Sequence, residues 1–380
     1  MKIVYFVHDV YDAAVERRVR MFNAAGAHTT VLGFRRRDLP MKQLGSAPVI
    51  DLGRTEDARM VQRLGAVIGG LMHPGKLLEA AREADIIIGR NLEAFALACR
   101  AHAAAPKARL VYECLDIHRL LIESSFPARA LQAVQSRLLR DTDLILTSSP
   151  AFEREYFRPN VHHLPPVYLV ENKLLMLGSG PEPVSEQAPL PSQPPWTIGW
   201  FGMLRCRKTF DLLAELVRGS SGRIKVNIAG RPSPAQFADF EAMVADVPGF
   251  SFHGPYAPGD LPQLYASCHF AWAIDFFEEG LNSSWLLPNR IYEAMAHGVV
   301  PIALDSVEVG RWLVARNAGL VVPDAKASLR EVLLTLDSQQ VEQLQAQVAA
   351  VPVTDLVATK ADCDALMAAL DGLSVPEVTA

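Results

Sequence analysis

The sequence has 380 residues, half of them hydrophobic and 21% charged, with a formal net charge of −5. These proportions are typical of a soluble globular enzyme of two ordinary domains, and nothing in them suggests a nucleic acid partner. No uncharged hydrophobic run approaches the roughly 18 residues of a membrane-spanning helix. The five cysteines are scattered and lack CxxC spacing, which indicates reduced thiols in a cytoplasmic protein and excludes a zinc site or a disulfide framework.

The charge is distributed unevenly along the chain. The first 170 residues hold 23 Lys and Arg against 18 Asp and Glu, so the remainder is acidic. A basic half on an acidic chain suits an anionic partner, and an anionic lipid surface is the natural candidate. Ordinary scatter of charge explains the same excess equally well.

The first half of the chain alternates hydrophobic strands with helices. Strand-like runs are KIVYFV at 2–7, HTTVLGF at 28–34, DIIIGR at 85–90, RLVYECLD at 109–116 and DLILTSS at 143–149. Between the first two, Val15, Val19 and Phe22 recur at helical spacing and predict a helix over 14–25, which Gly26 ends.

A segment rich in Pro, Ser and Gly, Gly178–Pro195, predicts a linker or long exposed loop. The alternation then resumes, with strands expected at 196–202, 224–230, 250–256, 270–276 and 299–304 and helices at 210–217 and 287–297. This pattern predicts an α/β fold of two Rossmann-like domains facing a cleft, with ligands at the carboxyl ends of parallel strands. The expected parts are an N-terminal domain over 1–173, a linker over 174–195, and a C-terminal domain over 196–380 whose last helices could pack back on the first domain.

Several cofactor and catalytic motifs are absent. No GxGxxG follows the first strand, and glycine does not occur at all from Val7 to Ala25, which argues against a dinucleotide site there. GxxxxGK[ST], HExxH and GxSxG are missing as well. Two DxD triplets, Asp141/Asp143 and Asp362/Asp364, precede a strand and lie in a tail helix, so neither is placed for a metal at the cleft.

The segment Leu287–Ala303, LPNRIYEAMAHGVVPIA, combines a helix start with two charged side chains on one face. Pro288 suits the first turn, Asn289 follows it, and the upstream NSS at 282–284 could cap an earlier start. The free N–H groups and Arg290 suit a phosphate, while Glu293 can accept two hydrogen bonds from a ribose. The competing interpretation is an i,i+3 ion pair on a surface helix.

A second basic segment follows the strand at 196–202. In TIGWFGMLRCRKTFDLL, Gly202 allows close approach of a ligand, and Arg205, Arg207 and Lys208 come just before an amphipathic helix. This arrangement predicts a second diphosphate contact on the same sheet. A solvated basic loop is the alternative.

With these segments in order, Trp196–Pro323 resembles the nucleotide-sugar half of GT-B glycosyltransferases, most closely family 4. The PNRxxE version resembles enzymes of bacterial exopolysaccharide assembly. The resemblance implies a nucleotide diphosphate sugar as donor. Because the helix dipole and the basic side chains would stabilise the leaving diphosphate, we expect no metal requirement. The family motif carries two glutamates, and at the position of the first one this chain has Trp285. Met203 replaces the arginine that usually follows the glycine turn, while Lys208 matches the usual lysine. Glu278 or Glu279 could substitute for the missing glutamate, so retaining stereochemistry stays open.

The N-terminal half resembles the first βαβ unit of exopolysaccharide glycosyltransferases more weakly. Family position points to Asp116 and His118 as the catalytic group that takes the acceptor proton; a helix cap and its neighbour would look the same. The acceptor-side candidates at strand ends are His8, Asp9, Arg90 and Glu113. Beside Arg90, Asn91 and Glu93 are either further contacts with the acceptor or ordinary surface residues at a helix start.

Two basic, hydrophobic segments, Arg59–Arg82 and Phe126–Arg140, could lie on an anionic bilayer, although core-facing helices look similar. Taken together, the sequence predicts a glycosyltransferase that moves a sugar from a nucleotide diphosphate sugar to a hydroxyl of a lipid-linked saccharide, at the inner face of the cell membrane. A non-catalytic GT-B-like binding subunit and a nucleotide-sugar epimerase of the same fold are the alternatives.

Overall fold

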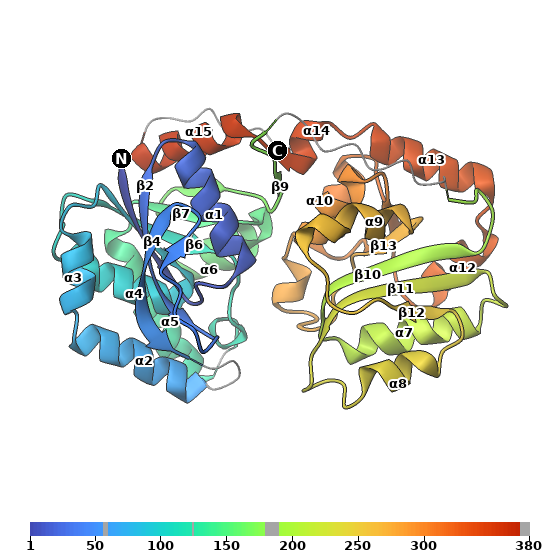
Figure 1. The fold of residues 1–380 in the computed structure, drawn as a ribbon, viewed down its shortest axis with the longest axis horizontal. Helices are drawn as coiled ribbons and strands as arrows, with labels where there is room; N and C mark the ends of the chain where they lie inside the picture. Colours follow the sequence, from blue (N-terminus) through green and yellow to red (C-terminus); the bar gives the residue numbers. More distant parts are fainter. Residues whose placement is uncertain (56–59, 124, 179–189, 373–380) are drawn as a thin grey trace. The chain divides into compact units, whose positions relative to one another are not determined.

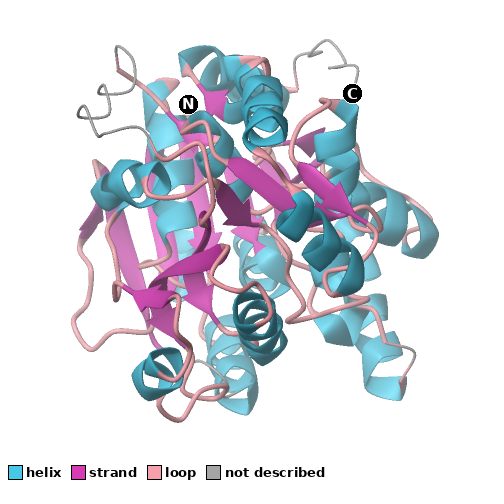
Figure 2. Cartoon of the chain, turned by 90° about the vertical axis from the view of Figure 1, so that its right-hand side faces the viewer, coloured by secondary structure: helices cyan, strands magenta, loops and turns pink. Residues whose placement is uncertain are grey.

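The computed structural model describes residues 1–55, 60–123, 125–178 and 190–372, and it divides into two compact units. Unit 1 comprises Met1–Glu171 together with Ala358–Ala380, and unit 2 comprises Asn172–Val357. Each unit is a mostly parallel sheet flanked by helices (Figure 1), and the colouring by secondary structure in Figure 2 shows the helices lying against the strands.

In the part of unit 1 that the structure describes, the sheet has eight strands. They are β1 Lys2–Val7, β2 His28–Arg35, β3 Gln43–Leu44, β4 Ala47–Arg54, β5 Ile86–Arg90, β6 Arg109–Cys114, β7 Leu144–Thr147 and β8 Val167–Leu169. The helices are α1 Ala13–Ala24, α2 Met60–Met72, α3 Gly75–Ala81, α4 Asn91–His102, α5 Phe126–Leu138, α6 Arg158–Asn160 and α15 Lys360–Asp371, with short helical segments η1 Arg119–Leu121, η2 Leu139–Asp141 and η3 Phe152–Phe157.

The strand order in unit 1 is β3-β4-β2-β1-β5-β6-β7-β8, and every neighbouring pair is parallel except β3 with β4. Strands β2, β4 and β3 extend the sheet from one edge of β1, and strands β5 to β8 extend it from the other edge. The order therefore reverses between β1 and β5, and in open α/β sheets the crevice at such a switch point is where ligands bind.

Among the described residues, unit 2 has a six-stranded sheet and the remaining helices, α7 to α14. Its strands are β10 Trp196–Leu204, β11 Ile224–Pro232, β12 Phe250–Phe252, β13 Phe270–Trp272, β14 Val300–Leu304 and β15 Leu320–Val322, and a separate pair joins β9 Leu174–Leu175 to β16 Val357–Ala358. The helices are α7 Arg207–Arg218, α8 Phe240–Ala245, α9 Leu261–Ala266, α10 Asn289–Ala296, α11 Glu308–Ala315, α12 Ala327–Thr335, α13 Ser338–Ala349 and α14 Val353–Leu356, with short segments η4 Pro258–Asp260 and η5 Asn282–Ser284.

The six strands of unit 2 are all parallel, in the order β12-β11-β10-β13-β14-β15. Alternate residues of β10 point to opposite faces, so the Trp200 ring packs against Phe240 of α8 (6.3 Å between centroids), whereas the Phe201 ring packs against Tyr265 of α9 (5.2 Å). Helices α7 and α8 accordingly lie on one side of the sheet and α9 and α10 on the other (Figure 1). The order reverses between β10 and β13, which marks the switch point of this unit.

The alternating strands and helices confirm the predicted α/β class, with some shifts at element ends. The strand predicted at 270–276 ends at Trp272, although the N–H of Ala273 still donates to the carbonyl of Ile302 on β14 (3.0 Å). Residues 282–284 were to cap the helix only if it started earlier; they form η5 instead, and α10 begins after Pro288.

The join between the two units falls at Glu171/Asn172, and the chain later returns to unit 1. Asn172 Nδ2 donates to the carbonyl of Leu287 (2.9 Å) and Lys173 Nζ to that of Thr354 (2.8 Å), so these residues are tied to unit 2 before the predicted boundary at 173. Helix α15 packs against α1 and β6, where Arg109 Nη1 donates to the carbonyl of Leu370 (2.8 Å). Residues 179–189 of the predicted linker lie outside the described residues.

Across the described ranges, no helix combines the length and the hydrophobicity needed to cross a lipid bilayer.

Candidate active site

The switch point of unit 2 brings together two loops, and the predicted donor-site residues lie on these loops or on the strand and helices that adjoin them. Arg205 follows β10, and the segment 273–288 follows β13, the strand next to β10 in the sheet. Because the strands are parallel, both loops emerge at the carboxyl edge. Helix α10 starts from the second of these loops.

The first turn of α10 is open to a ligand. Pro288 occupies the N-cap position with extended backbone, and no side chain caps the helix. The amino end of a helix carries partial positive charge and N–H groups without intrahelical partners, which together favour an anion.

Arg290 and Glu293, one turn apart on α10, are each held by a neighbouring element. Arg290 Nη1 donates to the carbonyl of Trp272 at the end of β13 (3.3 Å). Glu293 Oε2 accepts from the hydroxyl of Tyr265 on α9 (3.4 Å). Both side chains are partly exposed, so each keeps surface for a ligand.

Two tyrosines surround Glu293, and sequence reasoning did not single them out. Burial, together with the charge of Glu293, raises the pKa of Tyr256 to about 12 and that of Tyr265 well above its ordinary value. Both phenols therefore stay protonated and can donate hydrogen bonds near this carboxylate. The Tyr265 ring also stacks on His297 (5.4 Å between centroids), whose Nδ1 lies 2.7 Å from the Glu293 carbonyl.

Gly202 and Gly230 allow an unusually close approach of β10 and β11 at this edge. Their φ angles are +118° and +141°. A Cβ on Gly230 would lie 1.8 Å from the carbonyl oxygen of Gly202. Glycine is thus required at position 230, and Gly202 presents bare backbone just before the basic loop.

Two of the three predicted basic residues contact the loop that follows β13. Arg205 Nη2 lies 3.9 Å from Asp275 Oδ2, with its guanidinium over the Phe277 ring (4.4 Å). Lys208 Nζ lies 2.5 Å from Glu279 Oε2 and 4.2 Å from the Phe276 ring centroid.

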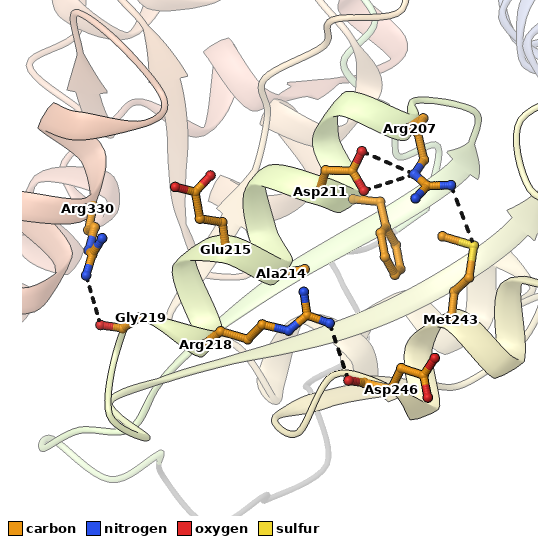
Figure 3. A pocket seen from close by; sticks show the side chains of 10 residues that line it. Arg207, Asp211, Ala214, Glu215, Arg218, Gly219, Met243, Asp246 and Arg330 are labelled. Carbon is orange, nitrogen blue, oxygen red and sulfur yellow. Dashed lines mark hydrogen bonds and ion pairs between the residues drawn. The ribbon is translucent and has the colours of Figure 1, made fainter.

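Arg207 lies elsewhere, in a groove of about 620 Å³ that runs along α7 toward Gly219. Its Nε pairs with both oxygens of Asp211 (2.9 and 3.2 Å), as Figure 3 shows. The other two arginines of the groove donate to backbone carbonyls, Arg218 to that of Asp246 and Arg330 to that of Gly219. Acidic and basic side chains balance along this groove, so its charge favours no anion.

In unit 1, the predicted residues His8 and Asp9 follow β1 at the switch point. His8 Nε2 lies 3.6 Å from Oδ2 of Asp12, whose Oδ1 caps α1 by accepting from the N–H of Ala14 (2.9 Å). Asp12 was not among the predicted site residues, although its i,i+4 spacing from His8 in the sequence could have indicated it. Asp9 is buried, which raises its pKa, and it accepts from the N–H of Tyr11 and pairs with Arg36.

Arg90 and Glu113, both predicted to face an acceptor, are buried instead. With Tyr5 and Arg18 they form what we call the buried cluster: Arg18 Nε donates to Glu113 Oε1 (2.6 Å), and Arg90 Nη1 donates to the Tyr5 hydroxyl (2.8 Å), which donates to Glu113. Glu113 is 0% exposed and Arg90 1%. Burial opposes the charge of Glu113, but the two arginines outweigh it and hold its pKa below the ordinary value.

The two residues predicted as catalytic, Asp116 and His118, lie on the exposed segment after β6. His118 Nδ1 accepts from the N–H of Leu120 (3.3 Å) and caps η1, which is the structural role that the sequence had left open. A ring nitrogen bound in this way does not exclude a second role for the other nitrogen.

The DxD residues carry structural hydrogen bonds. Asp143 Oδ2 accepts from the N–H of Leu110 (2.7 Å) and Asp362 Oδ2 from that of Thr359 (2.7 Å). Within the described part of the chain, no group of three or more His, Cys, Asp or Glu side chains is arranged to hold a metal ion.

Comparison with known proteins identifies relatives over the full chain. The profile of a family described as "Glycosyl transferases group 1" matches residues 195–338. The chain is 42% identical over 381 residues to succinoglycan biosynthesis protein ExoL of Rhizobium meliloti (strain 1021), a match that covers 99% of this chain and 94% of that protein.

Solved structures share the fold at lower identity. The structure of Anabaena Alr3699/HepE in complex with UDP and glucose superposes with a TM-score of 0.70 at 17% identity, covering 98% of this chain and all of that one. Sucrose-phosphate synthase from Thermosynechococcus elongatus gives a TM-score of 0.74 at 15% identity, covering 97% and 98%.

Proposed function

This chain belongs to the group 1 glycosyltransferases and has the GT-B fold of two Rossmann-like domains, and from this premise we propose that it moves a sugar from a nucleoside diphosphate sugar to a saccharide hydroxyl. The 42% identical relative named for succinoglycan biosynthesis supports bacterial exopolysaccharide assembly as the setting. The UDP in the Anabaena structure supports a uridine nucleotide as the first donor to test.

One observation carries the donor assignment: the uncapped start of α10 holds Arg290 and Glu293 at the switch-point edge of the unit 2 sheet. We assign the diphosphate to the helix N-terminus and Arg290, with Asn289 in the same turn. We assign the ribose hydroxyls to Glu293, whose carboxylate accepts two hydrogen bonds. These are the roles that the family resemblance implies for the same residues.

Arg205 and Lys208 are the proposed second contact with the diphosphate, beside the bare backbone of Gly202. Their present partners, Asp275 and Glu279, are acidic groups that a diphosphate would replace. Arg207, bound to Asp211 in the groove along α7, is the weaker candidate for this role.

The proposed transfer is a single exchange of bonds at the anomeric carbon. The acceptor oxygen bonds to that carbon and loses its proton, the bond from carbon to the diphosphate oxygen breaks, and the diphosphate leaves with the electron pair. Helix dipole and cationic side chains stabilise the charge that develops on the leaving group, so we propose that no metal is needed.

We propose that the acceptor binds to unit 1 and that Asp116 or His118 takes its proton. Both are exposed, as a group that meets a substrate must be. Asp116→Asn and His118→Gln should each lower kcat and leave nucleotide binding unchanged. A drop in nucleotide affinity instead would contradict this division of roles.

A lipid-linked acceptor would bring the enzyme to a membrane surface, and α5 suits such a surface. The helix has no acidic residue, and its exposed side chains include Phe126 (85%), Val134 (50%), Arg129 and Arg137. On α2, Ile68 and Met72 are also exposed. Phe126→Glu should abolish sedimentation with anionic vesicles; equal sedimentation of the variant and the wild type would refute a docking role for α5.

The donor site is tested by thermal shift with UDP, GDP, ADP and dTDP on the wild type and on Glu293→Ala. A ligand that binds only the folded protein raises its melting temperature. We expect a shift with one nucleotide, lost in Glu293→Ala and kept in Glu342→Ala, a control at an exposed glutamate on α13. Absence of any shift with the wild type would refute the donor site.

A further inference from the structure

Asp275 is a carboxylate at the donor edge that sequence reasoning did not single out. It follows β13 by three residues, in the loop that leads to α10. Its Oδ1 accepts from the N–H of Phe277 (2.9 Å), a local turn that fixes the orientation of the carboxylate. Its Oδ2 faces Arg205 Nη2 at 3.9 Å, beyond a direct hydrogen bond, and the side chain is 20% exposed.

A recess opens beside this carboxylate. It is small, about 20 Å³, which is room for a single hydroxyl group and not for a whole sugar ring, and its polar lining consists of Asp275, Ser283 and Arg290. The hydroxyl of Ser283 already accepts from the N–H of Glu278 (3.0 Å). Among the side chains that line this recess, Asp275 is the carboxylate and Arg290 the cation.

The position of Arg290 determines what can enter the recess. If Arg290 holds the diphosphate, the sugar attached to that diphosphate must lie within a few bonds of it. Sugar hydroxyls are hydrogen-bond donors, and a fixed carboxylate is the acceptor that binds them most strongly. The recess therefore places one such acceptor next to the phosphate site.

The other carboxylates of this loop are less suited to the same role. Glu279 is 55% exposed on its side chain and pairs with Lys208 at 2.5 Å. Neither Glu279 nor Glu278 lines the recess. Trp285 occupies the position where the family resemblance would place a sugar-binding glutamate, so the family's usual acceptor is missing from this chain.

We propose that Asp275 binds the hydroxyls of the donor sugar and sets which sugar is accepted. This assignment rests on the proposed donor site and extends it from the nucleotide to the sugar. When the sugar hydroxyls bind Asp275, the guanidinium of Arg205 turns from this carboxylate to the diphosphate.

The test compares a nucleotide with its sugar conjugate, because only the conjugate reaches Asp275. Asp275→Asn keeps the size of the side chain and the oxygen that accepts from Phe277, while it removes the charge. By titration calorimetry we expect UDP to bind Asp275→Asn within about twofold of the wild type, and UDP-glucose to bind about tenfold more weakly, the effect of losing one charge-assisted hydrogen bond. GDP and GDP-mannose serve as the second pair.

Two control variants separate this inference from the donor site itself. Glu293→Ala should weaken UDP and UDP-glucose together, and Glu279→Gln should leave the UDP-to-UDP-glucose ratio unchanged. Two results would overturn the role of Asp275 and leave the donor site standing. One is that Asp275→Asn and the wild type bind the conjugate with equal affinity, and the other is that Asp275→Asn loses affinity for UDP and UDP-glucose in parallel. Failure of the wild type to bind any of the four nucleotides would overturn both.

Discussion

Replacing Glu113 with Gln tests the buried cluster most directly. The substitution keeps the shape of the side chain but removes the carboxylate that two buried cations, Arg18 and Arg90, share, and it leaves Arg90 only the Asp12 carboxylate at 4.0 Å. Removing one partner of a buried ion pair costs about 3–5 kcal/mol of unfolding free energy. For a domain of 150–250 residues each kcal/mol corresponds to about 2–4 °C, so the melting temperature of unit 1 should fall by about 6–20 °C.

Urea denaturation followed by circular dichroism measures this loss. The matched control is Glu83→Gln, which breaks the exposed ion pair with Lys2 (2.6 Å) and should change stability little. Adding Arg18→Met to Glu113→Gln should restore part of the stability, because one of the two orphaned cations is then gone. A loss in Glu113→Gln no larger than that in Glu83→Gln would refute the reasoning.

Three further predictions follow from contacts described above. Tyr265→Phe removes a donor to Glu293, so UDP should bind a few-fold more weakly by calorimetry while 2′-deoxy-UDP changes less; equal losses would contradict a positioning role. Gly230→Ala should lower the urea midpoint strongly, unlike Gly259→Ala, where a Cβ meets open space; similar midpoints would refute the close approach of β10 and β11. Because the pKa of Glu113 is lower in the folded chain than in the unfolded chain, its stabilisation is present above the ordinary pKa and is lost as pH falls through the folded value. Stability of the wild type should therefore fall more steeply in acid than that of Glu113→Gln, and parallel pH profiles would argue against this linkage.

The sequence predicted the sheets well because hydrophobic runs and helical periods are local signals. Segments such as KIVYFV and IKVNIAG form strands, as their hydrophobic runs predicted. The start of α10 at Pro288, with Arg290 and Glu293 one turn apart, also follows from a local pattern of proline, arginine and glutamate.

The outcome for single side chains was poorer, because their surroundings come from distant parts of the chain. Arg90 and Glu113 lie at strand ends, as the sequence indicated, but Tyr5 and Arg18 enclose them from other elements. Arg205 and Arg207 are two residues apart, yet one faces the loop after β13 and the other faces Asp211. Asp275 carries no motif, and only the recess beside Arg290 draws attention to it.

The return of the chain to unit 1 through α15 has a consequence for biosynthesis. The segment that completes unit 1 leaves the ribosome about 200 residues after Glu171, which at usual elongation rates is roughly 10–40 s later. During that interval the carbonyls of Ala369 and Leu370 are not yet available to Arg109, and the surfaces of α1 and β6 that α15 covers stay open. A nascent chain of this enzyme therefore completes its first domain only after its second has been synthesised.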